Sequence, residues 1–162
     1  MVNLSHNSLV SSCFLRWLEE RLSGRRAFAS QFVFQISETD ALIAQHHLIT
    51  FCEVIEKLGC KLSLSNFGCT PKPLRYLSLV PAAYVKLDTG LLRKIDVNQA
   101  KLKFLSALIE ELHKKGIRVI APMLEQLPML PLLWRANVDF MQGNCLHPCL
   151  LYTSDAADEE DS

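Results

Sequence analysis

The sequence lacks several features that would assign it quickly to a class of protein. Lysine and arginine together number 17, as do aspartate and glutamate, so no basic excess indicates a nucleic-acid partner or an anionic membrane surface. No apolar run reaches the roughly 20 residues that a membrane span needs. The opening MVNLSHNSLV also has no basic region followed by an apolar stretch. We therefore predict a cytoplasmic protein with no membrane span and no nucleic-acid partner.

Cysteine pairs and phosphate-binding loops are missing as well. The six cysteines include no CxxC spacing, and a 162-residue chain that is 49% hydrophobic can bury a core without disulfides, so we expect free, mostly buried thiols. No glycine-rich loop of the kind that cradles a nucleotide phosphate is present, which disfavours a doubly wound nucleotide-binding sheet.

Strand and helix patterns alternate along the chain with short connections. This alternation predicts an α/β protein with a parallel sheet and right-handed crossovers. One helix is expected before Gly24, and a long one capped by Asp40 and ended by Gly59. Trp134, in a helix whose start is limited by two prolines, is predicted to belong to the core. The predicted strands are 32–36, 61–65, 83–88, 117–122 and 138–143, with the end of another at the start of the chain.

Polar residues and a proline recur where the predicted strands end. A (β/α) barrel builds its site from the carboxyl ends of many strands, so this recurrence favours a barrel. Eight strands are needed for closure, and we therefore expect an incomplete barrel whose first strands are missing. The strand-end residues are Asn3, Gln35, Asn66, Lys86, Asp88, Pro122 and Gln142.

Six short segments carry a family resemblance. In chain order they read VNLS, FQISE, LSNFG, YVKLD, VIAPMLE and DFMQG. Together they resemble the EAL domain family of cyclic di-GMP phosphodiesterases and receptors, over residues 1–148. The resemblance implies a TIM-type barrel that here begins after the E-x-L strand. Residues 149–162 break the strand-helix pattern and resemble a translated sequencing adapter, so we interpret them as a non-native or disordered tail.

The resemblance also assigns roles to single positions. Family positions that hold metal-binding acids fall on Gln35, Ser65, Asn66 and Pro122. Two-metal hydrolysis of a phosphodiester needs hard anionic oxygens, so we expect a degenerate domain that is not an enzyme and holds no metal. The positions implied to contact the ligand are Asn3, Lys86, Asp88, Pro122, Met123, Glu125 and Gln142.

The function that the resemblance implies is that of a cyclic di-GMP receptor. A subgroup of inactive family members acts in type IV pilus and twitching control, and similarity to that subgroup around Trp134 implies a PilZ-domain protein as partner. Two alternatives stay open. One is a protein–protein interaction module that no longer binds nucleotide. The other is a residual phosphodiesterase, in which neutral side chains would do the work of carboxylates.

Overall fold

The computed structural model describes residues 1–78, 80–93, 95, 97–122 and 127–143. The chain divides into two compact units, Met1–Asp88 and Thr89–Ser162, each with its own strands and helices. Within the described ranges, no helix combines the length and the apolar character that crossing a membrane requires.

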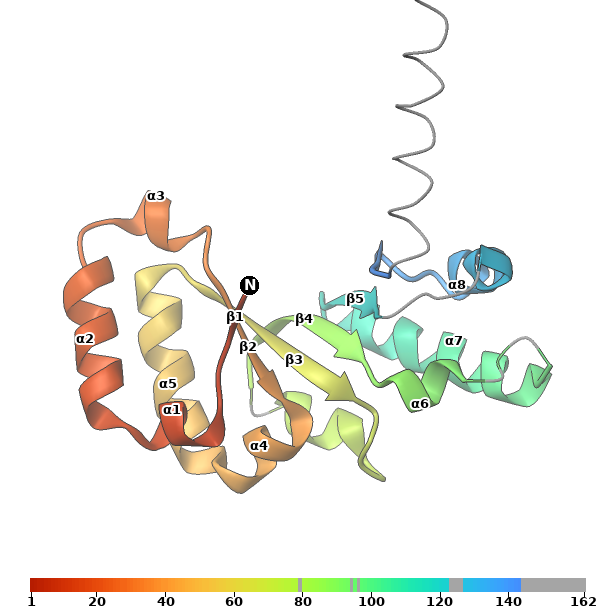
Figure 1. The fold of residues 1–162 in the computed structure, drawn as a ribbon, viewed down its shortest axis with the longest axis horizontal. Helices are drawn as coiled ribbons and strands as arrows, with labels where there is room; N and C mark the ends of the chain where they lie inside the picture. The colour runs from red at the N-terminus through yellow and green to blue at the C-terminus, as the bar shows by residue number, and fades with distance from the viewer. Residues whose placement is uncertain (79, 94, 96, 123–126, 144–162) are drawn as a thin grey trace, which may run out of the picture. The chain divides into compact units, whose positions relative to one another are not determined.

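The first unit contains four parallel strands and their connecting helices (Figure 1). The strands follow chain order, with β2 between β1 and β3, and β4 beyond β3. All four carboxyl ends therefore lie at one edge of the sheet. The elements are β1 (Val2–Asn3), α1 (His6–Val10), α2 (Ser12–Leu22), α3 (Arg26–Ala29), β2 (Val33–Ser37), α4 (Glu38–Ile43), α5 (Gln45–Leu58), β3 (Lys61–Phe67), the 3₁₀ helix η1 (Pro73–Ser78) and β4 (Ala82–Leu87).

The core of the first unit forms where α5 packs on the sheet. Leu48, Phe51 and Ile55 recur at helical spacing and are almost fully buried. The ring of Phe51 meets that of Phe34 on β2 edge to face, with centroids 5.6 Å apart. Because side chains alternate along a strand, Phe34 pointing toward α5 places Gln35 on the opposite face, which we call the inner face.

Hydroxyl and backbone geometry correct two helix predictions in this unit. Ser37, and not Asp40, is the N-cap, since its Oγ accepts a hydrogen bond from the amide of Asp40. The long helix expected up to Gly59 is two helices with a break at Ala44, although Gly59 does end the second in a left-handed conformation. The expected first helix is likewise two, because Ser11 is extended and its hydroxyl caps Phe14.

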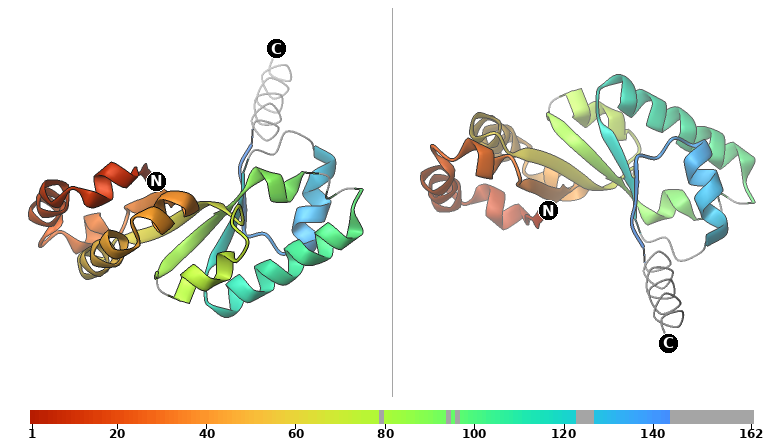
Figure 2. Two further views of the ribbon diagram at one scale, coloured as in Figure 1. Left: turned by 90° about the horizontal axis from the view of Figure 1, so that it is seen from below. Right: turned by 90° about the horizontal axis from the view of Figure 1, so that it is seen from above.

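The second unit is built on two parallel strands and a long amphipathic helix. Helix α7 packs on β5 (Figure 2), and its Leu105, Ile109 and Leu112, which recur at helical spacing, are buried. Strand β5 pairs with β6. The elements are α6 (Thr89–Leu92), α7 (Gln99–Lys114), β5 (Arg118–Ala121), the 3₁₀ helix η2 (Leu127–Met129), α8 (Leu130–Arg135) and β6 (Phe140–Met141).

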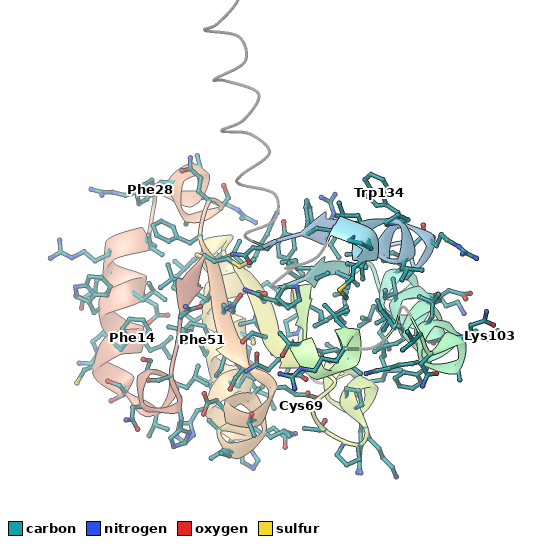
Figure 3. The ribbon with its side chains drawn as sticks, turned by 45° about the vertical axis from the view of Figure 1, so that its right-hand side comes forward. Phe14, Phe28, Phe51, Cys69, Lys103 and Trp134 are labelled. Carbon is teal, nitrogen blue, oxygen red and sulfur yellow. The ribbon has the colours of Figure 1, made fainter. Side chains whose placement is uncertain are left out.

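Two side-chain predictions differ from the structure. Trp134 was expected in the core, but 66% of it is exposed and it projects from α8 (Figure 3), where Leu133 takes the buried place instead. Among the described cysteines all are free, yet only Cys52 and Cys60 are buried. Burial, with the nearby charges of Glu56 and Glu53, raises the pKa of Cys52 to about 12 and so keeps this thiol unreactive.

Candidate functional site

The strand-end residues of the first unit gather at the carboxyl edge of its sheet. Asn3 ends β1 and lies in register with Gln35 on β2. Ser65 of β3 lies in register with Ser37 of β2, so the inner face carries polar side chains on neighbouring strands. The geometry therefore brings these positions together, as the sequence predicted for a site at the strand ends.

Asn3 and Gln35 form a pair of amides. The Gln35 Nε2 donates a hydrogen bond of 2.9 Å to the Asn3 Oδ1. Asn3 is exposed, whereas Gln35 is half-buried. The Oε1 of Gln35 is buried and has no hydrogen-bond partner among the described residues. One end of this side chain is thus fixed, while the other end has an unmet hydrogen bond.

The Ser65–Asn66 pair lies at a change of backbone direction. Asn66 has a φ of +52°, in the left-handed region that asparagine tolerates better than most residues. The amide of Cys69 donates to the carbonyl oxygen of Asn66 at 3.4 Å and closes the turn. Ser65 is half-buried and Asn66 is exposed. Two neutral side chains therefore lie near the carboxyl end of β3.

A buried carboxylate holds the loop that follows this strand. Glu38 is 1% exposed, and its Oε2 accepts from the amides of Gly68 and Cys69 at 2.9 and 3.1 Å. The Cys69 thiol donates to the same oxygen at 3.3 Å, and the Thr70 hydroxyl donates to Oε1 at 2.5 Å. The loop, marked by Cys69 in Figure 3, is thereby fixed to the start of α4.

The same contacts set the chemistry of Cys69. Desolvation, the hydrogen bond to Glu38 and the charges of Glu38 and Asp88 raise the pKa of the Cys69 thiol. A thiol with a raised pKa stays protonated and is a poor nucleophile or metal ligand. Cys69 therefore acts as a hydrogen-bond donor to Glu38, the carboxylate that fixes the loop.

Lys86 and Asp88 come from the end of β4. The amide of Asp88 donates to the carbonyl oxygen of Phe67 at 2.8 Å, which extends the pairing of β3 and β4 to this edge. Both side chains are half-buried. Lys86 thus brings an ammonium group and Asp88 a carboxylate to the edge that also carries the neutral side chains of Gln35, Ser65 and Asn66.

The remaining predicted positions belong to the second unit. Pro122 directly follows β5 and is buried, and Gln142 follows β6 and is exposed. The amide of Gln142 donates to the carbonyl oxygen of Ala121 at 2.9 Å, so the two positions lie at the same edge of the β5–β6 pair. The predicted ligand residues Met123 and Glu125 lie outside the described residues, as does the predicted tail.

Several oxygen atoms at this edge already accept hydrogen bonds within the protein. The Asn3 Oδ1 accepts from Gln35, and both oxygens of Glu38 accept from the loop. Within the described ranges, no three histidine, cysteine, aspartate or glutamate side chains converge as metal ligands. A hard cation at this edge would share these oxygens with the hydrogen-bond donors that they already accept from.

Sequence reasoning missed Ser63, Thr70 and Cys69. Thr70 and Cys69 are loop residues that act on Glu38, and a family motif read for metal ligands gives no reason to select them. Ser63 lies two residues before Ser65, so strand alternation places both on the inner face. That spacing could have identified Ser63, but the prediction considered only residues at the ends of the strands.

Comparisons with known proteins agree with the fold. The model of the EAL domain family matches residues 1–148. The chain is 30% identical to the FimX EAL domain from Pseudomonas aeruginosa in a crystal structure bound to c-di-GMP, with a TM-score of 0.81, covering 88% of this chain and 58% of that one. It is 25% identical to Vibrio cholerae LapD S helix-GGDEF-EAL bound to c-di-GMP, with a TM-score of 0.79, covering 89% and 35%. The predicted α/β, TIM-type barrel fold is confirmed.

Curated relatives contradict one prediction. The chain is 24% identical over 142 residues to the cyclic di-GMP phosphodiesterase PdeB of Shewanella oneidensis, and 23% identical over 142 residues to PdeF of Escherichia coli. These matches cover 88% of this chain but only 17% and 19% of those proteins. The prediction that the chain is not an enzyme is therefore wrong as drawn, since proteins like it are named phosphodiesterases.

The prediction was wrong because it inferred the absence of a reaction from the identities of a few side chains. Carboxylates remain at Glu38 and Asp88, and Mg²⁺ accepts amide and carbonyl oxygens besides carboxylates. Neutral residues at Gln35, Ser65 and Asn66 lower the negative charge of the edge, but a reaction depends on the complete set of groups around the substrate. Four neutral positions are therefore not enough to conclude that the reaction is absent.

Proposed function

The chain belongs to the EAL domain family, and from this premise we propose that it binds cyclic di-GMP. Two of the similar structures, the FimX EAL domain and LapD, hold this nucleotide, and their identity to the chain reaches 30% and 25%. The observation that carries the proposal is the edge of the first unit, where amide and hydroxyl groups stand on neighbouring strands beside Lys86. The amide, hydroxyl and ammonium groups of this edge are of the kinds that hydrogen-bond to an anionic ligand.

The neutral side chains of Ser65 and Asn66 lower the repulsion of a phosphate at this edge, where Asp88 is a remaining carboxylate. A carboxylate about 4 Å from a phosphate repels it by about 4 kcal/mol at an effective dielectric near 20. Ser65 and Asn66 carry no such charge, and the buried carboxylate of Glu38 is matched by donors from its loop. We therefore include metal-independent binding in the proposal.

Titration calorimetry in chelator and in Mg²⁺ tests the proposal. We expect similar affinity in both conditions, and a loss of about 1.5–3 kcal/mol in binding free energy for Lys86→Ala, which removes a contact to a charged group. Lys103→Ala is the matched control, because Lys103 is an exposed lysine on α7 (Figure 3). The same samples should be checked for linear dinucleotide, so that heat from turnover is separated from heat of binding.

A charge-restoring variant sharpens the test. Ser65→Asp with Asn66→Asp should weaken binding in chelator, because two carboxylates return to the mouth of the strand. A folded chain that gives no binding heat at high nucleotide concentration contradicts the proposal, and the interaction-module alternative then takes its place. The roles in type IV pilus control, a PilZ-domain partner and a cytoplasmic location stay predictions.

A further inference from the structure

The centre of β3 holds a second unmet hydrogen bond. Ser63 has no exposed surface, and its Oγ has no hydrogen-bond partner among the described residues. Ser63 is the register partner of Gln35, whose buried Oε1 is unmatched in the same way. Asn3 pairs with Gln35 on one side and Tyr84 with Ser63 on the other.

Gln35 and Ser63 share one side of the sheet. Phe34 points toward α5, so its neighbour Gln35 points to the inner face, and register partners on parallel strands point the same way. The two unmatched atoms therefore belong to adjacent side chains and do not lie in separate parts of the core. Buried polar atoms without partners are rare in native proteins, and two in neighbouring positions indicate a shared partner.

The spacing and chemistry suit a single water molecule. Neighbouring strands lie about 4.8 Å apart, and two hydrogen bonds of about 2.8 Å that meet at a water span nearly this distance. Because the Nε2 of Gln35 donates to Asn3, the unmatched atom of Gln35 is the acceptor Oε1. A water can donate one hydrogen to this oxygen and also donate to, or accept from, the Ser63 hydroxyl, so one molecule satisfies both groups.

We propose that one buried water bridges the Gln35 side chain and the Ser63 hydroxyl. Ser63 is thereby a positioning residue for the carboxyl edge of the first unit's sheet, where the nucleotide is proposed to bind. The chain of contacts runs from Ser63 through the water to Gln35, and from Gln35 Nε2 to the Asn3 Oδ1. Ser63 therefore orients the exposed amide of Asn3 indirectly, through the water and Gln35, and does not itself contact the ligand. The positioning role rests on the proposed nucleotide binding, whereas the water does not.

The Ser63→Ala variant tests the water through the sign of its effect. If the hydroxyl has no partner, its removal relieves an unmet burial cost and raises the melting temperature. If the water bridges it to Gln35, removal breaks a hydrogen bond and lowers the melting temperature by several degrees. Ser106→Ala is the control, because the half-buried Ser106 hydroxyl donates to the Leu102 carbonyl at 3.0 Å and is already paired. A raised melting temperature for Ser63→Ala overturns the proposal.

A double-mutant cycle and a binding measurement test the rest. Ser63→Ala and Gln35→Leu should be non-additive in stability, because both remove the same water. Ser63→Ala should also weaken cyclic di-GMP binding several-fold, whereas Ser106→Ala should not. Unchanged affinity with lowered stability overturns the positioning role. If the unaltered chain binds no nucleotide, the proposed function fails while the cycle still tests the water.

A high-resolution crystal structure of the unaltered full chain gives an answer that does not depend on variants. Density for one atom within hydrogen-bonding distance of both Gln35 and the Ser63 Oγ supports the proposal. Ligand distances near 2.3 Å would indicate a cation and overturn it, and so would continuous apolar packing between the two side chains. This measurement also decides the case if Ser63→Ala does not fold.

Discussion

Glu38 and Gln35 lie three residues apart in the chain and differ in how completely their polar atoms are bonded. Both oxygens of Glu38 accept hydrogen bonds, from two amides, a thiol and a hydroxyl of one loop. Gln35 uses one end for Asn3, and its other end is buried without a partner among the described residues. A fully bonded buried group holds structure in place, whereas an incompletely bonded one marks where a further molecule completes the network.

Replacing Glu38 should have the largest effect on stability. Glu38→Ala leaves the Gly68 and Cys69 amides and the Thr70 hydroxyl without their acceptor, and we expect a loss of about 3–5 kcal/mol in the free energy of unfolding. Chemical denaturation measures it. Glu53→Ala on the exposed side of α5 is the control and should change stability little. A loss below about 1 kcal/mol for Glu38→Ala would mean that the loop does not depend on this carboxylate.

A single donor to Glu38 should have a smaller effect. Thr70→Val keeps the side-chain shape and removes the hydroxyl that donates to the Glu38 Oε1, so we expect a loss of about 1.5–3 kcal/mol, as for other hydrogen bonds to charged groups. The matched control is Thr50→Val on α5, whose exposed hydroxyl makes a weaker bond of 3.4 Å to the His46 carbonyl. Equal losses for the two variants would show that the Glu38 cluster is no stronger than an ordinary helix-surface contact.

The order of strands and helices could be predicted because alternation and periodicity are local. The spacing of Leu105, Ile109 and Leu112 identifies α7, and glycine at position 59 identifies a helix end. The breaks at Ser11 and Ala44 could not be predicted in this way. A serine hydroxyl can cap a new helix or remain in an existing one, and the choice depends on tertiary packing. Trp134 was misplaced because the prediction rested on its residue type, whereas in α8 it is Leu133 that is buried.

The candidate site was predictable in position but not in chemistry. Parallel strand ends bring Asn3, Gln35 and Ser65 to one edge whatever their side chains, so their proximity follows from topology. Whether a group is saturated depends on contacts from distant segments, such as the 30 or more residues between Glu38 and its loop. The inference from four neutral positions to a lost reaction is contradicted by relatives that are named phosphodiesterases, and it used side-chain identity alone.

Asp139 in the second unit provides a surface counterpart to Glu38, and its effect should be the smallest. Its Oδ2 accepts from the Val119 amide at 2.7 Å and lies 2.8 Å from the Nε2 of His113. Desolvation opposes the charged form, but the hydrogen bonds from Val119 and His113 and the charges of His113 and Arg118 outweigh it and lower the pKa of Asp139 below 3.8. A carboxylate with a lowered pKa stabilises the fold fully above its unfolded pKa, and the stabilisation is lost as the pH falls through its folded pKa.

The free energy of unfolding of the wild type should therefore exceed that of Asp139→Asn by at most about 1 kcal/mol near pH 7, because the pair is partly exposed. Denaturation curves recorded from pH 7 to pH 3 should show this difference constant above about pH 5 and shrinking below pH 4. Glu20→Gln on the exposed surface of α2 serves as control and should follow wild type. A difference that widens toward pH 3 would mean that the folded state raises the pKa of Asp139, and the likeness to a bonded carboxylate such as Glu38 would then be lost.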